Sequence, residues 1–161
     1  LLGCESRLGP RFAFTTRPNK TQKQALLERY YTPQPRTDFA QQAREQINAC
    51  IDLSDGLLGD LAHILEASGV SAQLNLEALP YSETLMAVLC AEQREHAALG
   101  GGDDYELCFT VVPESLAGVQ AIARSLALAV TPIGFIAEGL GLTLNREGEA
   151  IELASNAYRH F

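Results

Sequence analysis

The sequence predicts an α/β (α+β) fold in which a mixed β-sheet packs with helices. Helical and strand patterns alternate along the 161 residues, an order typical of layered domains that combine both elements. The hydrophobic content of 47% is that of an ordinary globular domain, and the chain is long enough to bury a core. No internal repeat or low-complexity tract interrupts the pattern.

The N-terminal part of the chain predicts two short helices. No clear period precedes the first of them, and we interpret residues 1–32 as a linker or N-terminal arm. Thr21 and Gln24 have the spacing of a capping box, which predicts a helix that ends before a proline-containing segment. Asp38 occupies a similar cap-like position before a second helix, which we expect to end near Asn48.

A strand, a polar turn and a helix are expected next. The apolar run 49–51 predicts a buried strand. After the turn, apolar residues recur at spacings of three, four and seven, which predicts an amphipathic helix to about Ala67 with a stop at Gly69. These apolar residues are Leu57, Leu58, Leu61, Ile64 and Leu65. Alternating apolar residues then predict a strand over residues 71–76.

The second half repeats this alternation. Residues 82–98 predict a helix, and residues 105–112 predict a strand because β-branched and aromatic residues gather there. Residues 114–129 return to a helical pattern. Three short strands are expected at 130–136, 140–144 and 149–153, the last two as a possible pair.

The polar turn Asp52-Leu53-Ser54-Asp55-Gly56 contains the most concentrated chemistry of the chain. A helix N-terminus suits an anion, but two carboxylates would repel a phosphate that approached the same place. A magnesium ion resolves this conflict, because it accepts carboxylate and phosphate oxygens together. In the structural alternative, Ser54 or Asp55 only caps the helix and Gly56 relieves crowding. The turn by itself leaves both interpretations open.

A second acidic loop, Gly100-Gly101-Gly102-Asp103-Asp104, precedes the strand at 105–112. Its glycines allow close approach by a ligand or by another loop. Its two carboxylates could bind a cation or a metal, or could only contact solvent. Glu106 alternates with apolar neighbours, which predicts a place on a polar strand face.

Composition excludes several classes of function. There are 20 acidic and 12 basic residues, and the formal charge of −8 argues against a nucleic-acid or anionic-membrane surface. The four cysteines lack metal-binding spacing, and we interpret Cys50 and Cys108 as buried thiols in a reducing cytoplasm. Asp60 and His63 could support the neighbouring motif, but exposed or locally satisfied positions are commoner for such residues.

Three segments occur in the order and approximate spacing of one enzyme family. They are Asp52-Leu53-Ser54-Asp55-Gly56-Leu57, Gly101-Gly102-Asp103-Asp104-Tyr105-Glu106-Leu107 and Tyr158-Arg159-His160-Phe161. The sequence resembles the C-terminal domain of the thiamine-monophosphate kinase family, within the aminoimidazole ribonucleotide synthetase superfamily. The resemblance identifies residues 33–161 with this domain. It makes residues 1–32 the remnant of a junction to a missing N-terminal domain.

The resemblance implies ATP- and magnesium-dependent phosphorylation of thiamine monophosphate to thiamine diphosphate. Asp52 and Asp55 would be magnesium ligands, and Ser54 would contact ATP. Asp103 and Tyr158 would contact the substrate. No residue of this chain is assigned to a covalent step, because phosphoryl transfer depends mainly on positioning and charge neutralisation.

Some features depart from the family pattern. The family usually has glutamate at the position of Asp103 and aspartate at the position of Arg159. Its N-terminal domain provides further magnesium-binding aspartates and the usual dimer interface, so the isolated chain would be catalytically incomplete. The complete parent is expected to be a cytoplasmic homodimer that binds neither nucleic acid nor membranes. The alternatives are another ATPase of the superfamily, selenophosphate synthetase-like or hydrogenase-maturation, or a non-catalytic ligand-binding domain.

Overall fold

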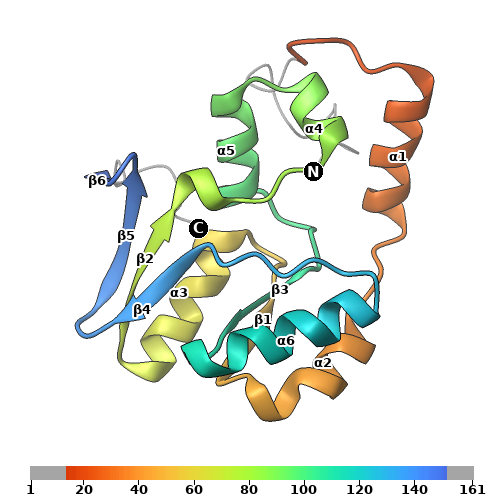
Figure 1. The fold of residues 1–161 in the computed structure, drawn as a ribbon. Helices are drawn as coiled ribbons and strands as arrows, with labels where there is room; N and C mark the ends of the chain where they lie inside the picture. Colours follow the sequence, from red (N-terminus) through yellow and green to blue (C-terminus); the bar gives the residue numbers. More distant parts are fainter. Residues whose placement is uncertain (1–13, 152–161) are drawn as a thin grey trace.

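The computed structural model describes residues 14–151, in which helices surround two β-sheets (Figure 1). The α-helices are α1 (Lys20–Tyr31), α2 (Thr37–Ala43), α3 (Leu57–Ser68), α4 (Glu83–Val88), α5 (Ala91–Gly100) and α6 (Pro113–Ser125). The 3₁₀ helices are η2 (Arg44–Gln46) and η3 (Leu76–Ala78). The strands are β1 (Ala49–Asp52), β2 (Ser71–Asn75), β3 (Leu107–Thr110), β4 (Gly134–Ala137), β5 (Gly141–Arg146) and β6 (Glu149–Ile151).

The larger sheet is mixed, as predicted. Its strand order is β4-β2-β5-β6, with β2 antiparallel to β4 and parallel to β5. The expected pairing of the last two strands is confirmed, because β6 runs antiparallel to β5. Strands β1 and β3 do not join this sheet and form a separate antiparallel ribbon. The predicted elements are therefore present, but they are divided between two sheets.

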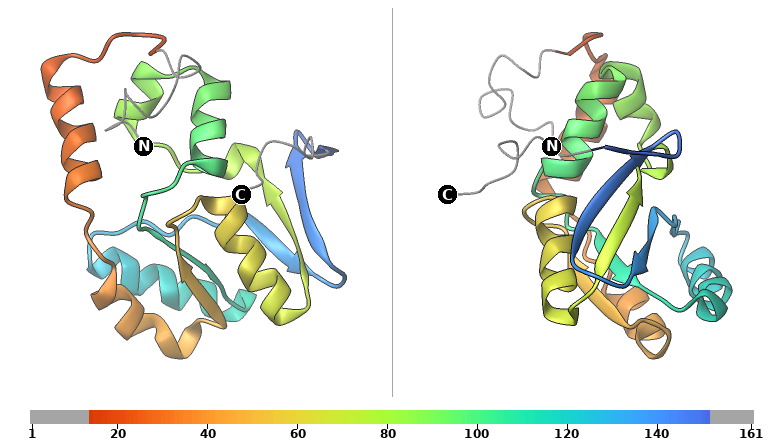
Figure 2. Two further views of the ribbon diagram at one scale, coloured as in Figure 1. Left: turned by 180° about the vertical axis from the view of Figure 1, so that it is seen from behind. Right: turned by 90° about the vertical axis from the view of Figure 1, so that its left-hand side faces the viewer.

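Helix α3 packs against one face of the larger sheet (Figure 2). Its five predicted apolar positions are all buried, and they share a core with Ala72 and Leu74 of β2 and Leu144 of β5. Gly69 ends the helix in the left-handed conformation, at φ 65°, as its position in the sequence predicts. This packing fixes the start of α3, and with it the polar turn that precedes the helix.

A second, smaller core lies between α2 and α6. Phe39 and Ala43 of α2 pack there with Val119 and Ala123 of α6. Alternate residues of β3 contact different cores, because successive side chains on a strand point to opposite faces. Phe109 joins the smaller core, whereas Cys108 joins the core around α3. The β1–β3 ribbon therefore separates the two cores.

Several helix boundaries differ from those predicted. The helix expected over 82–98 is interrupted at Leu89, which has an extended backbone and is buried beside Val88. The capping box of α1 is formed by Asn19 and Gln22, two residues earlier than the predicted pair of Thr21 and Gln24. Asp38 lies inside the first turn of α2 and does not cap it.

The two strand cysteines have different environments. Cys108 is buried, as predicted, and burial raises the pKa of its thiol to about 11. Cys50 is exposed, which corrects the sequence prediction. Its neighbours Ala49 and Ile51 face the α3 core, so the alternation of side chains along β1 turns Cys50 away from that core.

The boundary proposed at residue 32 directly follows α1 and stays a prediction. Within residues 14–151, no helix combines the length and the hydrophobicity needed to span a membrane.

Candidate functional site

The two acidic motifs lie side by side because the β1–β3 hydrogen-bond ladder continues beyond both strands. The Leu53 amide donates to the Glu106 carbonyl at 2.8 Å, and the Tyr105 amide donates to the Leu53 carbonyl at 2.8 Å. One step further, the Asp103 amide donates to the Ser54 carbonyl at 2.9 Å. Two segments far apart in the sequence thus form one acidic surface at the end of the ribbon.

Glycine is required where the motifs meet. A Cβ atom on Gly102 would lie 2.4 Å from the carbonyl oxygen of Ser54, closer than real Cβ contacts allow. Gly56 has φ +108°, and a Cβ atom there would lie 3.0 Å from the Gly100 backbone. The close approach expected for the glycine-rich loop is therefore an approach to the other motif.

The loop between α5 and β3 has an uncommon backbone. Asp103 and Tyr105 have φ angles of 66° and 51°, in the left-handed region that non-glycine residues seldom adopt. The Tyr105 hydroxyl donates a hydrogen bond to Oδ1 of Asp103 at 3.2 Å. Such conformations persist when the surrounding structure holds them, and they concentrate at functional sites.

Three exposed carboxylates act on the Tyr105 ring. The hydrogen bond to Asp103 raises the pKa of the Tyr105 hydroxyl, and the charge of Asp103 adds to this effect. The charges of Asp52 and Asp55 raise the pKa further. The Tyr105 hydroxyl is therefore influenced by carboxylates of both motifs, which the sequence presented as two separate loops.

The polar turn does not cap α3 with a side chain. The N-cap position is Gly56, and no side-chain hydrogen bond closes the helix end there. The capping alternative for Ser54 and Asp55 is therefore wrong. Asp52 and Asp55 are exposed and Ser54 is half-buried, so these side chains are accessible at the surface.

Asp60 is the residue whose importance sequence reasoning underestimated. It is 3% exposed, and its Oδ2 accepts hydrogen bonds from the Ser54 amide at 2.9 Å and the Asp55 amide at 3.1 Å. Helical spacing contained the signal, because Asp60 lies three residues after Leu57 and four before Ile64 on the buried stripe. His63, in contrast, is exposed as expected.

Glu106 has a more specific role than a polar strand face. Its carboxylate accepts two hydrogen bonds from Arg36, at 2.9 Å from Nε and 2.8 Å from Nη2. Arg29 of α1 forms an ion pair with the same carboxylate. The three residues connect α1 and the start of α2 to the acidic loop. Sequence reasoning missed this cluster because its partners are distant along the chain.

A metal ion bound to the part of the chain that the structure describes would have few protein ligands. No group of three or more histidine, cysteine, aspartate or glutamate side chains there is arranged to hold a metal ion. Asp52 and Asp55 are two exposed carboxylates of one turn, and magnesium commonly uses one or two carboxylates together with water and phosphate. Tyr158, the other predicted substrate contact, lies outside the described residues.

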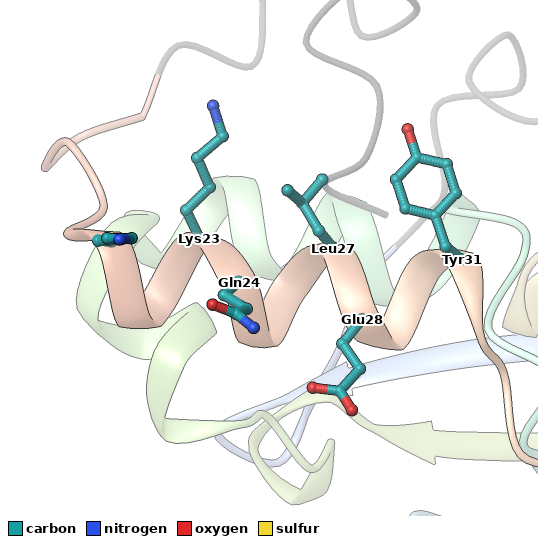
Figure 3. Close-up of a pocket in the computed structure, with 6 residues that line it drawn as sticks. Lys23, Gln24, Leu27, Glu28 and Tyr31 are labelled. Atoms are coloured by element: carbon teal, nitrogen blue, oxygen red, sulfur yellow. The ribbon is translucent and has the colours of Figure 1, made fainter.

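A surface hollow lies along α1, and its lining contains no residue of the two acidic motifs (Figure 3). Its lining residues are Lys20, Lys23, Gln24, Leu27, Glu28 and Tyr31. None of them belongs to either acidic motif, and α1 buries no residue. The hollow is the face of an exposed helix.

Comparison with known families decides the relationship. Residues 13–146 match the family "AIR synthase related protein, C-terminal domain". The chain belongs to this family. The expected resemblance to the C-terminal domain of thiamine-monophosphate kinases is also confirmed, because a curated relative from Escherichia coli K12 is 42% identical over 138 residues. That match covers 84% of this chain and 42% of the relative.

Solved structures agree with this membership of the AIR synthase related C-terminal family. The crystal structure of thiamine-monophosphate kinase from Stenotrophomonas maltophilia K279a superposes with a TM-score of 0.76 at 38% identity, over 84% of this chain and 42% of that one. A structure described as AaThiL complexed with AMPPCP and TMP has a TM-score of 0.66 at 29% identity, over 86% of this chain and 42% of that one. The chain thus spans about two fifths of the length of the relatives it matches.

The contact between Gly102 and Ser54 predicts a stability effect. Gly102→Ala should reduce the free energy of unfolding by about 1–3 kcal/mol, because the new methyl group forces the two backbones apart. Urea unfolding followed by circular dichroism measures the change. Gly59→Ala is the matched control, since the nearest atom to its Cβ would be 3.9 Å away. Equal stability of both variants would contradict the close approach.

Asp104 predicts a pH-dependent effect. Burial raises the pKa of this half-buried carboxyl, with the charge of Asp103 acting in the same direction. Ionised Asp104 therefore destabilises the fold above its folded-state pKa, and this penalty disappears below its unfolded-state pKa. Asp104→Asn should raise the melting temperature at pH 7, and the gain should shrink on acidification. Glu138→Gln, at an exposed position, should show no such trend. A gain independent of pH would point to another cause.

Proposed function

We propose that this chain is the C-terminal part of an ATP-dependent kinase that phosphorylates thiamine monophosphate to thiamine diphosphate. The observation that carries the proposal is the joining of the two acidic motifs by the extended ladder, where Asp103 lies against Ser54. The relatives that share this fold at 38–42% identity are named thiamine-monophosphate kinases. A structural relative was solved with AMPPCP and TMP, which supports a nucleotide and a phosphorylated substrate as ligands.

In this proposal, Asp52 and Asp55 hold magnesium and Ser54 contacts ATP. The fit rests on the donor set, because two exposed carboxylates leave room for phosphate oxygens and water around a hard cation. The bound cation would neutralise charge on the transferred phosphate. The N-terminus of α3 follows directly after Gly56, and its positive end favours the same anionic ligand. The chain's own contribution is binding and orientation.

Asp103 is the proposed contact to the thiamine moiety. Its exposed carboxylate suits the cationic thiazolium ring, and its hydrogen bond from Tyr105 restrains its orientation. Aspartate replaces the family's usual glutamate, so the carboxylate is one methylene shorter. Tyr158 is proposed as an aromatic contact to the same cation.

The rest of the proposed enzyme is contributed by an N-terminal domain of the same polypeptide. The relatives are more than twice as long as the matched region, which supports this part of the proposal. We propose that the complete parent is a cytoplasmic homodimer without nucleic-acid or membrane partners. The present chain alone should then turn over no substrate. Measured turnover by the isolated chain would refute the division of the site between two domains.

The decisive experiment uses the complete parent enzyme. Purified parent is incubated with magnesium, ATP and thiamine monophosphate, and thiamine diphosphate is quantified by fluorescence after oxidation to its thiochrome. Asp52→Asn should lower turnover by at least about tenfold without a change in melting temperature, because loss of a group that only supports a metal ligand already costs roughly 10- to 100-fold. Glu66→Gln, at an exposed position of α3, is the control and should retain full turnover.

The same assay separates the alternatives. A parent that hydrolyses ATP only with another acceptor belongs with a different ATPase of the superfamily, whereas a parent that binds ligand without turnover is a binding domain. Unchanged turnover in Asp52→Asn would remove that residue from the metal site.

A further inference from the structure

Asp60 is the charged side chain buried in the core of the described region. A carboxylate that leaves water is costly unless hydrogen bonds replace its solvation. Two hydrogen bonds converge on one oxygen of Asp60, Oδ2, and backbone amides of the polar turn donate both of them. The residue is therefore retained in the core by its contacts to Ser54 and Asp55.

These two amides need a partner inside the protein. The turn enters α3 through Gly56, whose φ of 108° reverses the chain without a side-chain cap. Backbone amides that face a core are almost always paired, because an unpaired one loses its bond to water. Asp60 supplies the acceptor from the first turns of α3, five and six residues further along the chain. The turn and the helix are thereby fixed to one another.

Asp60 faces the interior and not the acidic surface. Asp60 is 3% exposed, and its charge contributes to the raised pKa of the buried Cys108 thiol, after the larger effects of burial and of Cys50. Asp52 and Asp55 of the same turn are exposed, in contrast to Asp60. A buried carboxylate thus supports the backbone between two exposed ones.

We propose that Asp60 is a positioning residue, which holds the Ser54–Asp55 backbone so that Asp52, Ser54 and Asp55 present a preformed site for a divalent cation. The assignment of a cation to this site rests on the proposed function. The role of Asp60 in fixing the Ser54–Asp55 backbone does not. Asp60 acts through hydrogen bonds and not as a ligand. Its oxygen position therefore matters more than its charge.

The test compares two substitutions that separate position from charge. Asp60→Asn removes the charge but can keep a carbonyl oxygen in the place of Oδ2, where one atom accepts both bonds. Asp60→Glu keeps the charge but displaces the oxygens by one methylene. His63→Ala, at an exposed position of the same helix, is the control. Mn²⁺ serves as the probe, and its affinity for the complete parent enzyme is measured by electron paramagnetic resonance.

If Asp60 acts through the position of its oxygen, the Asp60→Asn variant should bind Mn²⁺ with an affinity within about threefold of wild type. The Asp60→Glu variant should bind Mn²⁺ at least tenfold more weakly than wild type. The reverse order would overturn the proposal and assign Asp60 a purely electrostatic role. Equal affinities in all variants would also overturn it. The amides of Ser54 and Asp55 provide a second readout by hydrogen exchange, expected to be slow in wild type and Asn and at least tenfold faster in Glu.

The amide exchange tests the positioning role of Asp60 separately from the proposed cation site. It gives an answer even if one variant does not fold. Fast exchange of both amides in wild type would overturn the positioning role, even if Asp60→Glu failed to fold. Slow exchange in a wild-type parent enzyme that binds no Mn²⁺ would contradict the proposed cation site and would still support the role of Asp60 in fixing the backbone.

Discussion

The close pairing of Ser54 with the 102–103 segment is the constraint on which the acidic surface depends. The ladder carries the two motifs past the ends of their strands, and only a glycine at 102 allows the final step. Helix α3 begins at one side of this contact and α5 ends at the other. A wider spacing between the backbones of Ser54 and Gly102 would therefore displace α3 and α5. It would also displace the three aspartates of the acidic surface.

Two carboxylates that do not face this surface stabilise it in different ways. Asp60 is buried, and its side chain accepts two partly buried hydrogen bonds from backbone amides. Glu106 is partly exposed and is held by Arg36 and Arg29, an arrangement that gives directional bonds through the planar guanidinium of Arg36. The first fixes a turn to its own helix, and the second connects distant helices to a loop.

Sequence periodicity predicted the elements well where one face is strongly apolar. The α3 stripe and its glycine stop follow directly from side-chain spacing, as does the strand at β2. The break at Leu89 was not predictable in this way, because both halves of that segment have helical composition and the burial of Leu89 is a tertiary effect. The division into two sheets has the same origin, since strand pairing is not contained in the pattern of any single strand.

The site was predicted as two motifs and found as one surface. The local motifs and the family resemblance identified Asp52, Asp55 and Asp103, but the joining of the two motifs depends on the register of β1 against β3. Asp60 was visible on the helical stripe, yet an aspartate on an apolar face gave no indication of which amides it accepts from. The Arg36–Glu106 pair required the path of the chain between them.

The ribbon between the two cores also determines when the surface can exist during folding. Its strands are distant in sequence, so the ends of a long segment must meet before the ladder forms. Cys108 and Phe109 pack into different cores, so the ladder is linked to the packing of both. We therefore expect the acidic surface to form together with the packed native state. A cation bound there would recognise the native state and not a partly folded chain, so its binding free energy would add directly to the stability of the whole fold.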